Sequence, residues 1–103
     1  MSNYDWVECE YTLPSSNAQY LRFQTKDILG LNNDFEISKK GRLLWHRYDD
    51  NGTLYGKVDL LWHGTIHIFA KVSHSKYKHY AYDLEFVRGQ LKEITTIAPF
   101  PGQ

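Results

Sequence analysis

The feature that most limits how this chain can fold is a two-residue alternation of apolar and polar side chains in its second half. Two segments carry it, "TIHIFAKV" (residues 65–72) and "HYAYDLEF" (residues 79–86). The residues on the apolar faces are Ile66, Ile68, Ala70 and Val72 in the first segment and Tyr80, Tyr82, Leu84 and Phe86 in the second. Because successive side chains of a strand point to opposite faces, both segments are predicted to be strands that bury one face.

Turn signals at short intervals predict that such strands are joined as hairpins. "SKKGR" suits a three-residue loop with Gly41 in the left-handed conformation, and "DDNGT" and "VRGQ" suit two-residue turns at Asn51-Gly52 and Arg88-Gly89. The predicted cross-strand pairs are Ile37 with Leu43 and Phe35 with Trp45 for the first turn, Tyr48 with Tyr55 for the second, and Phe86 with Leu91 and Glu85 with Lys92 for the third.

The first half of the chain is less regular. "WVECEYTLP" indicates a strand that ends at Pro14, "YLRFQTKD" a strand or a short helical turn, and "SSNAQ" and "ILGLNND" two loops. With about seven strands in total, the chain is predicted to be all-β, or β-rich α+β with at most one short helix. We expect a single antiparallel sheet, curled or folded into a small sandwich or barrel, in one domain over residues 1–103. Residues 98–103 are predicted to be a flexible tail, since two prolines cannot extend a central strand.

Composition narrows the function. Twelve basic residues balance twelve acidic ones, which disfavours a protein whose main task is to hold nucleic-acid phosphates and equally disfavours an acidic DNA mimic. The one cysteine, Cys9, lies between Glu8 and Glu10; neighbouring carboxylates raise a thiol pKa, so a cysteine nucleophile is not expected. The lone cysteine and the polar opening predict a cytoplasmic protein without a disulfide, and nothing in the sequence calls for a cofactor.

The motif "HGTIH" places His63 and His67 four residues apart and raises the question of a metal site. On a strand, four residues span about 13 Å, whereas two zinc ligands must each lie about 2 Å from the metal. Gly, Thr and Ile in a row disfavour the helix that would bring the histidines together. We therefore predict no metal site, with a bend at Gly64 and an outward-facing His67.

A metal-independent nuclease or hydrolase is a further candidate, with His67, His79 and Glu85 as its acid–base groups and Asp83 or Lys92 nearby. Such chemistry requires these side chains to converge on one point, which the sequence does not establish. In "FQTKD", Lys26 and Asp27 could act as polar site residues; the preferred interpretation is a turn in which the Thr25 and Asp27 side chains bond the backbone.

Two groups of residues are candidates for contact with a partner. "SHSKYKHYAY", residues 73–82, interleaves cations with tyrosines, the combination by which sheet surfaces hold single-stranded nucleic acid. The candidate binding residues are Lys76, Tyr77, Lys78 and His79 in this segment, together with Trp62 and His63. Trp6, Trp45 and Trp62 are most simply core residues, and an exposed one would mark a partner site.

Five segments in order, "WVECEYTLP", "FQTKD", "FEISKKGRL", "WHGTIHIF" and "YAYDLEFVRGQLKEI", resemble a set of short proteins from bacteriophages and prophages. The shared pattern is W-x-x-C-E-x-x-L-P, then F-Q-T-K-D, then G-R-L, then an aromatic strand that closes on G-x-L. This chain departs from it at Ile28, where the family has Leu, and at "SSNAQ". The resemblance implies a phage setting and carries over no catalytic residue.

A phage setting favours a small accessory protein that binds a bacterial or phage protein, as a host-takeover factor or as an inhibitor of a defence system such as a CRISPR effector. We predict contact through edge strands or through residues 73–80, by strand addition or aromatic anchoring. The alternatives are a single-stranded nucleic-acid-binding module that uses residues 73–80, and the small nuclease. The identity of the partner and the oligomeric state stay open.

Overall fold

The computed structural model describes residues 4–71 and 79–98. These residues form one eight-stranded sheet in the order β5-β4-β3-β1-β2-β6-β7-β8, in which β1 and β3 are parallel and all other neighbours antiparallel. The elements are β1 (Asp5–Cys9), the 3₁₀ turn η1 (Ser16–Ala18), β2 (Arg22–Thr25), β3 (Asp34–Ile37), β4 (Leu43–Tyr48), β5 (Leu54–Asp59), β6 (Gly64–Lys71), β7 (His79–Val87) and β8 (Gln90–Ala98).

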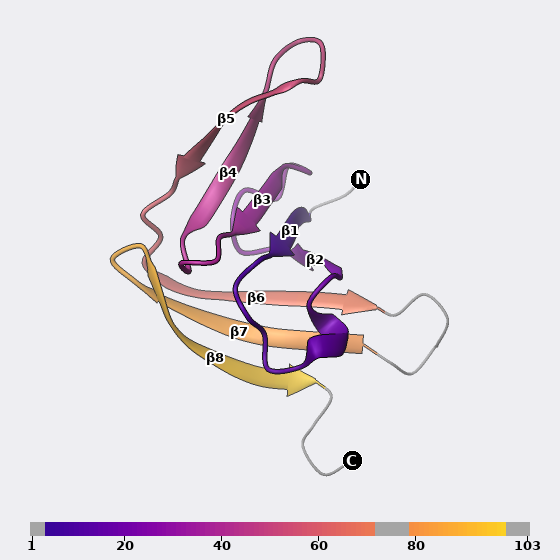
Figure 1. Ribbon diagram of the computed structural model, residues 1–103, viewed down its shortest axis with the longest axis vertical. Helices are drawn as coiled ribbons and strands as arrows, with labels where there is room; N and C mark the ends of the chain where they lie inside the picture. The colour runs from indigo at the N-terminus through magenta and orange to yellow at the C-terminus, as the bar shows by residue number, and fades with distance from the viewer. Residues whose placement is uncertain (1–3, 72–78, 99–103) are drawn as a thin grey trace.

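The sheet is open and strongly bent. In Figure 1 the β4–β5 hairpin rises away from the layer formed by β6, β7 and β8, and β1 and β2 lie between the two. The predicted all-β class and the single, mostly antiparallel sheet are confirmed. Sequential hairpins do not account for the whole sheet, since β1 lies between β2 and β3 and β2 pairs with β6. Ala98, expected in the tail, is the last residue of β8 and is buried, and 99–103 lie outside the described residues.

The core lies on the face of the sheet that the alternation predicts. Ile66, Ile68 and Ala70 of β6 are buried, as are Tyr82 and Leu84 of β7. Val72 lies outside the described residues. The remaining core side chains come from β1 to β4, β7, β8 and the loop around η1, and they are Val7, Cys9, Phe23, Phe35, Ile37, Leu43, Phe86, Leu91, Leu13 and Ala18. Burying these side chains is the main force that bends the sheet over itself.

The turn residues predicted part of the strand register correctly. Ile37 lies opposite Leu43 and Phe35 opposite Trp45, as the loop at Gly41 predicts; the Gly41 φ is +82°. In the β7–β8 hairpin Arg88 and Gly89 have φ values of 50° and 87°, as a two-residue turn requires. That hairpin pairs Phe86 with Leu91 as expected.

Two predicted pairs are wrong, one because the β4–β5 loop is longer than predicted and one because a bulge shifts the register of β7–β8. Tyr48 pairs with Leu54 and not with Tyr55: the hairpin closes as Asp49 N–H donates to Thr53 O, which leaves three residues in the loop. In the β7–β8 hairpin a register shift between Glu85 and Phe86 places Glu85 opposite Glu93 and not opposite Lys92. An extra residue in one strand has this effect wherever it is inserted.

A buried carboxylate organises the loop between β2 and β3. Asp5 is fully buried, and its two oxygens accept N–H groups of Leu29, Gly30, Leu31 and Asn33 at 2.6–3.2 Å. A buried charge needs such donors, because no water replaces them. "ILGLNND" is therefore a loop, as predicted, and it is wrapped around β1.

Candidate functional site

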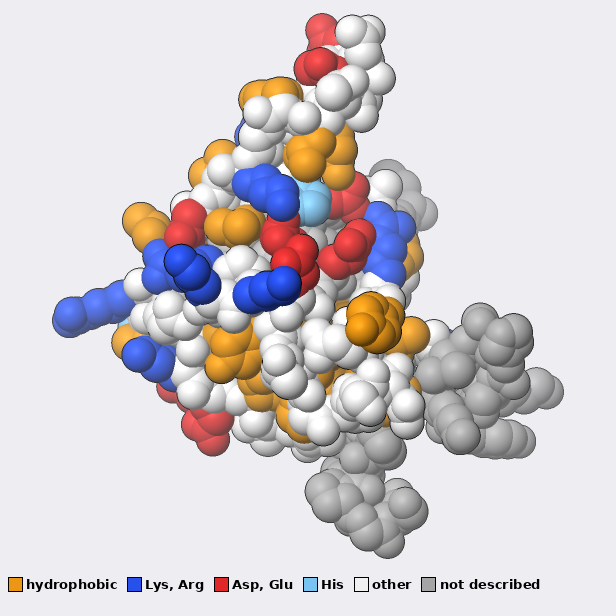
Figure 2. All heavy atoms as spheres, viewed as in Figure 1, with side chains coloured by type: hydrophobic (Ala, Val, Ile, Leu, Met, Phe, Trp, Pro, Cys, Tyr) orange, Lys and Arg blue, Asp and Glu red, His pale blue; other side chains and the backbone are white. Residues whose placement is uncertain are grey.

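One edge of the sheet is open and apolar. β5 pairs with β4 and with no other strand of the described residues. Its side chains Leu54, Tyr55 and Val58 are 42%, 63% and 46% exposed. Figure 2 shows apolar side chains on the protruding β4–β5 hairpin, below a tip that carries acidic groups. An edge with unpaired backbone and exposed apolar side chains is suited to pair with another chain.

The backbone of β5 offers hydrogen-bonding groups on its free side. Leu60 N–H donates to Leu43 O at 3.0 Å, so Leu60 belongs to the residues that bond the neighbouring strand β4. In an antiparallel ladder this role recurs at every second residue. Lys57 and Asp59 therefore direct their backbone N–H and C=O groups away from β4, toward the open edge.

A polar network holds β5 in place from the outer face of the sheet. Glu36 on β3 is 5% exposed and accepts from Lys57 Nζ at 2.5 Å, and it bonds His46 Nε2 at 2.8 Å. His46 Nδ1 lies 3.4 Å from the Tyr48 hydroxyl. Burial by itself raises the pKa of Glu36, but the hydrogen bonds and charges of Lys57 and His46 outweigh burial and lower this pKa below its usual value. Glu36 is thus a charged anchor beneath the hairpin.

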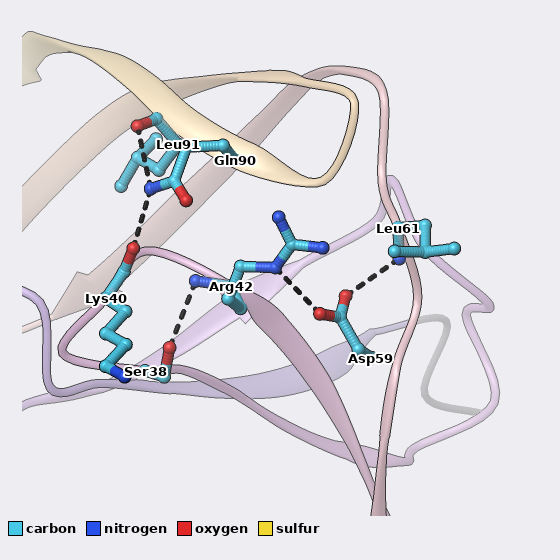
Figure 3. Close-up of polar contacts among 7 residues, drawn as sticks. All are labelled: Ser38, Lys40, Arg42, Asp59, Leu61, Gln90 and Leu91. Atoms are coloured by element: carbon cyan, nitrogen blue, oxygen red, sulfur yellow. Dashed lines mark hydrogen bonds and ion pairs between the residues drawn. The ribbon is translucent and has the colours of Figure 1, made fainter.

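The C-terminal end of β5 is fixed by an ion pair. Arg42 Nε donates to Asp59 Oδ2 at 2.7 Å, and Asp59 Oδ1 accepts the N–H of Leu61 at 2.9 Å. Figure 3 shows these contacts beside the Gln90 side chain, which donates to Lys40 O at the turn before β4. The C-terminal half of β5 is therefore positioned by the rest of the fold, while no described strand pairs with its outer edge.

The structure describes three of the six predicted binding residues, and these three lie at opposite ends of the β6–β7 pair. Lys76, Tyr77 and Lys78 lie outside the described residues. His79 is exposed at the start of β7, and His63 is exposed at the far end of the β6–β7 pair, where its Nδ1 accepts the N–H of Arg88 at 3.2 Å. Trp62 is partly buried against the core. His79 therefore lies apart from the neighbouring residues Trp62 and His63.

The other two tryptophans also contact the body of the protein. Trp45 packs against the core, with its ring stacked on Phe35. Trp6 donates Nε1–H to Asn32 Oδ1 at 2.8 Å, and the Arg22 guanidinium lies 4.2 Å above its ring. Each tryptophan is thus occupied by contacts within the chain.

The histidines of "HGTIH" take part in separate contacts. His67 faces outward on β6, with Nδ1 2.8 Å from Asp83 Oδ1, whereas His63 contacts the β7–β8 turn. Within residues 4–71 and 79–98, no three His, Cys, Asp or Glu side chains are grouped so that they could hold a metal ion.

The nuclease residues are only partly brought together. His67 and Asp83 form a pair, but His79 lies opposite Lys71, four residues farther along the strands and about 13 Å away. Glu85 lies opposite Thr65 and Glu93. His67 is therefore bonded to Asp83, and neither His79 nor Glu85 lies directly opposite it. The "QTKD" segment is a turn as predicted: Thr25 Oγ1 accepts Asp27 N–H, and the Asp27 carboxylate accepts His67 N–H.

Cys9 is buried and inert. Burial raises the pKa of its thiol to about 12; a hydrogen bond with the Tyr11 backbone opposes this shift, and the charge of Glu10 adds to it. The predicted direction is confirmed, with burial rather than the acidic neighbours as its main cause.

A broad cleft of about 990 Å³ lies beside Cys9 and the η1 loop. Its charged lining residues are Glu8, Glu10, Arg22 and Lys39, and the exposed ring of Tyr20 stands at it. Two carboxylates and two cations favour no particular ligand charge. The cleft by itself therefore defines no chemistry.

No family model, curated protein or solved structure matches this chain. Among the described residues, no helix has the length and the apolar composition that spanning a membrane requires. Function therefore has to be argued from the site itself.

Sequence reasoning missed the residues of the β5 edge. "TLYGKVD" looks like any strand that follows an Asn-Gly turn, and only its neighbours in the sheet decide whether it is central or at an edge. The Glu36 anchor could have been found, since the correctly predicted pair of Ile37 with Leu43 already brings Glu36 near His46.

Proposed function

We propose that this protein is a small accessory protein of the bacteriophage type, which acts in the bacterial cytoplasm by binding a bacterial or phage protein. The observation that carries the proposal is the open β5 edge, with Leu54, Tyr55 and Val58 exposed beside unpaired backbone groups. An extended segment of the partner adds to β5 as a ninth strand. Its backbone supplies affinity, and its apolar side chains pack on the exposed ones and supply specificity.

The biological purpose follows from the sequence resemblance alone. Small phage proteins that bind host proteins redirect the host or block its defences, CRISPR effectors included. Strand addition suits such a role because it needs no catalytic group on this chain. The Glu36 anchor supports the proposal, since it fixes β5 before the partner arrives and lowers the entropy lost on binding.

The test is a co-purification with a matched pair of variants. Tagged protein is expressed in a bacterial host, treated with nuclease, washed in moderate salt and analysed by mass spectrometry. Val58→Glu puts a charge on the β5 edge, whereas Thr95→Glu puts the same charge on β8, and both positions are exposed. We expect one stoichiometric partner on the wild type and on Thr95→Glu, and none on Val58→Glu.

Two results would contradict the proposal. Equal recovery of the partner by both variants would exclude β5 as the binding surface, provided that circular dichroism shows both to be folded. Recovery of nucleic acid alone, lost on nuclease treatment, would favour the single-stranded nucleic-acid-binding alternative.

A further inference from the structure

The open edge of β5 is complementary to itself. Two copies of one strand can pair antiparallel about a two-fold axis, in which case one residue lies on the axis and faces its own copy. The faces of the sheet must also match, because side chains that lie directly opposite point to the same side. The central positions of β5, Gly56, Lys57 and Val58, differ in how well an axis through them meets both conditions.

An axis at Lys57 is disfavoured, because it sets two lysines directly opposite each other. An axis at Gly56 brings Tyr55 against the second copy's Lys57, but farther out it sets Leu54 against Val58. These two side chains lie on different faces, since Leu54 is opposite Tyr48, Val58 is opposite Trp45, and a bulge intervenes. That register therefore breaks after one residue.

An axis at Val58 meets both conditions, and it also brings opposite charges together. It places Val58 against Val58 of the second copy and Lys57 against the second copy's Asp59, twice. This register therefore pairs a lysine with an aspartate, whereas an axis at Lys57 would pair two lysines. Lys57 and Asp59 are also the residues whose backbone groups face the open edge, so their pairing has the geometry of a hydrogen-bonded pair.

The surroundings of β5 fit the same register. The segment around Val58 lies beyond the bulge, where the ladder to β4 is regular from Leu44 to Arg47. Val58 is 46% exposed, and the exposed side chains of Tyr55 and Leu61 flank the segment on either side. Dimer formation does not bury an unpaired charge at this position, because Lys57 already contacts Glu36 and Asp59 already contacts Arg42.

We propose that a second copy of this chain occupies the β5 edge in the free protein, as a symmetric dimer whose two-fold axis passes through Val58. This inference rests on the proposed function in that both use the same edge. The dimer covers the apolar side chains until a partner displaces the second copy. Partner binding is therefore linked to dimer dissociation, and it weakens as the protein concentration rises.

The test combines sedimentation with site-specific crosslinking. Directly opposite residues of a non-hydrogen-bonded pair lie about 4.5 Å apart at Cα, within the range that a disulfide spans. Val58→Cys should therefore form a covalent dimer under mild oxidation. Tyr55→Cys in the same strand should not, since the axis holds its two copies about 20 Å apart. Thr95→Cys on β8 is the second control, and the wild type checks that buried Cys9 does not react.

We expect the crosslinked fraction of Val58→Cys to exceed that of both controls several-fold, and the wild type to sediment as a dimer that dissociates on dilution. A wild type that stays monomeric at high concentration would overturn the inference, even if Val58→Cys did not fold. Equal crosslinking of Val58→Cys and Tyr55→Cys would overturn it as well. If the protein is a monomer that captures a partner through β5, the dimer inference fails and the proposed function stands. If the protein is a dimer and its β5 variants still bind the partner, only the proposed function fails.

Discussion

The two edges of this sheet are treated differently. β5 exposes the apolar side chains Leu54, Tyr55 and Val58, whereas β8 at the opposite edge exposes Lys92, Glu93 and Thr95. Charged side chains on an edge discourage pairing with other chains. β8 therefore has the composition of a protected edge, whereas β5 combines exposed apolar side chains with two charges, Lys57 and Asp59, that are paired within the fold.

The layers behind the two edges differ as well. β8 lies against β7, which buries Tyr82, Leu84 and Phe86. β5 lies against β4, in which Leu43 is the one buried side chain of six. The β8 end thus contributes most to the stability of the fold, and the β5 end is free to contribute to binding. Three changes test this division of roles.

The largest effect is expected from truncation behind the β8 edge. Phe86→Ala removes a ring that is 1% exposed and leaves a cavity, so the free energy of unfolding should fall by about 3–5 kcal/mol. Tyr55→Ala, the matched truncation at the β5 edge, should change it by less than about 0.5 kcal/mol. Urea titration measures both. A comparable loss in the two variants would show that the β5 end is as much a part of the core as the β8 end.

An intermediate effect is expected at the anchor beneath β5. Glu36→Gln removes the charge that Lys57 and His46 contact, and should cost about 1–2 kcal/mol at neutral pH. The folded-state pKa of Glu36 lies below its unfolded value of 4.5, so its stabilisation is present above pH 4.5 and is lost as the pH falls through the lowered value.

The difference in stability between the wild type and Glu36→Gln should therefore shrink when unfolding is followed from neutral pH to below the folded-state pKa. A difference that stays constant over this range would mean that the charge of Glu36 does not stabilise the hairpin.

The smallest effect is expected on the β8 edge. Glu93 lies opposite Glu85, so Glu93→Lys replaces a cross-strand repulsion by an attraction and should raise the free energy of unfolding by about 0.5 kcal/mol, less at high salt. Glu93→Gln, which removes the repulsion without adding an attraction, should give only part of this gain. If Glu93→Lys had no effect while Lys92→Glu were strongly destabilising, the register would be the bulge-free one that the turn alone predicts.

Local patterns in the sequence determined much of this fold. The alternation in residues 65–71 and 79–86 predicted two strands and their buried faces, and the glycine turns predicted the pairs Phe35–Trp45 and Phe86–Leu91. These features depend on residues close together in the chain, where the two-residue period and the left-handed turn positions limit the choices.

Tertiary structure decided the rest. The parallel pairing of β1 with β3 and the burial of Asp5 depend on segments distant in sequence. The candidate site belongs to this second group. Whether β5 is central or at an edge depends on which strands lie beside it, and no property of "TLYGKVD" by itself encodes that. The sequence determined that β5 is a strand, and the order of the sheet left its outer side open.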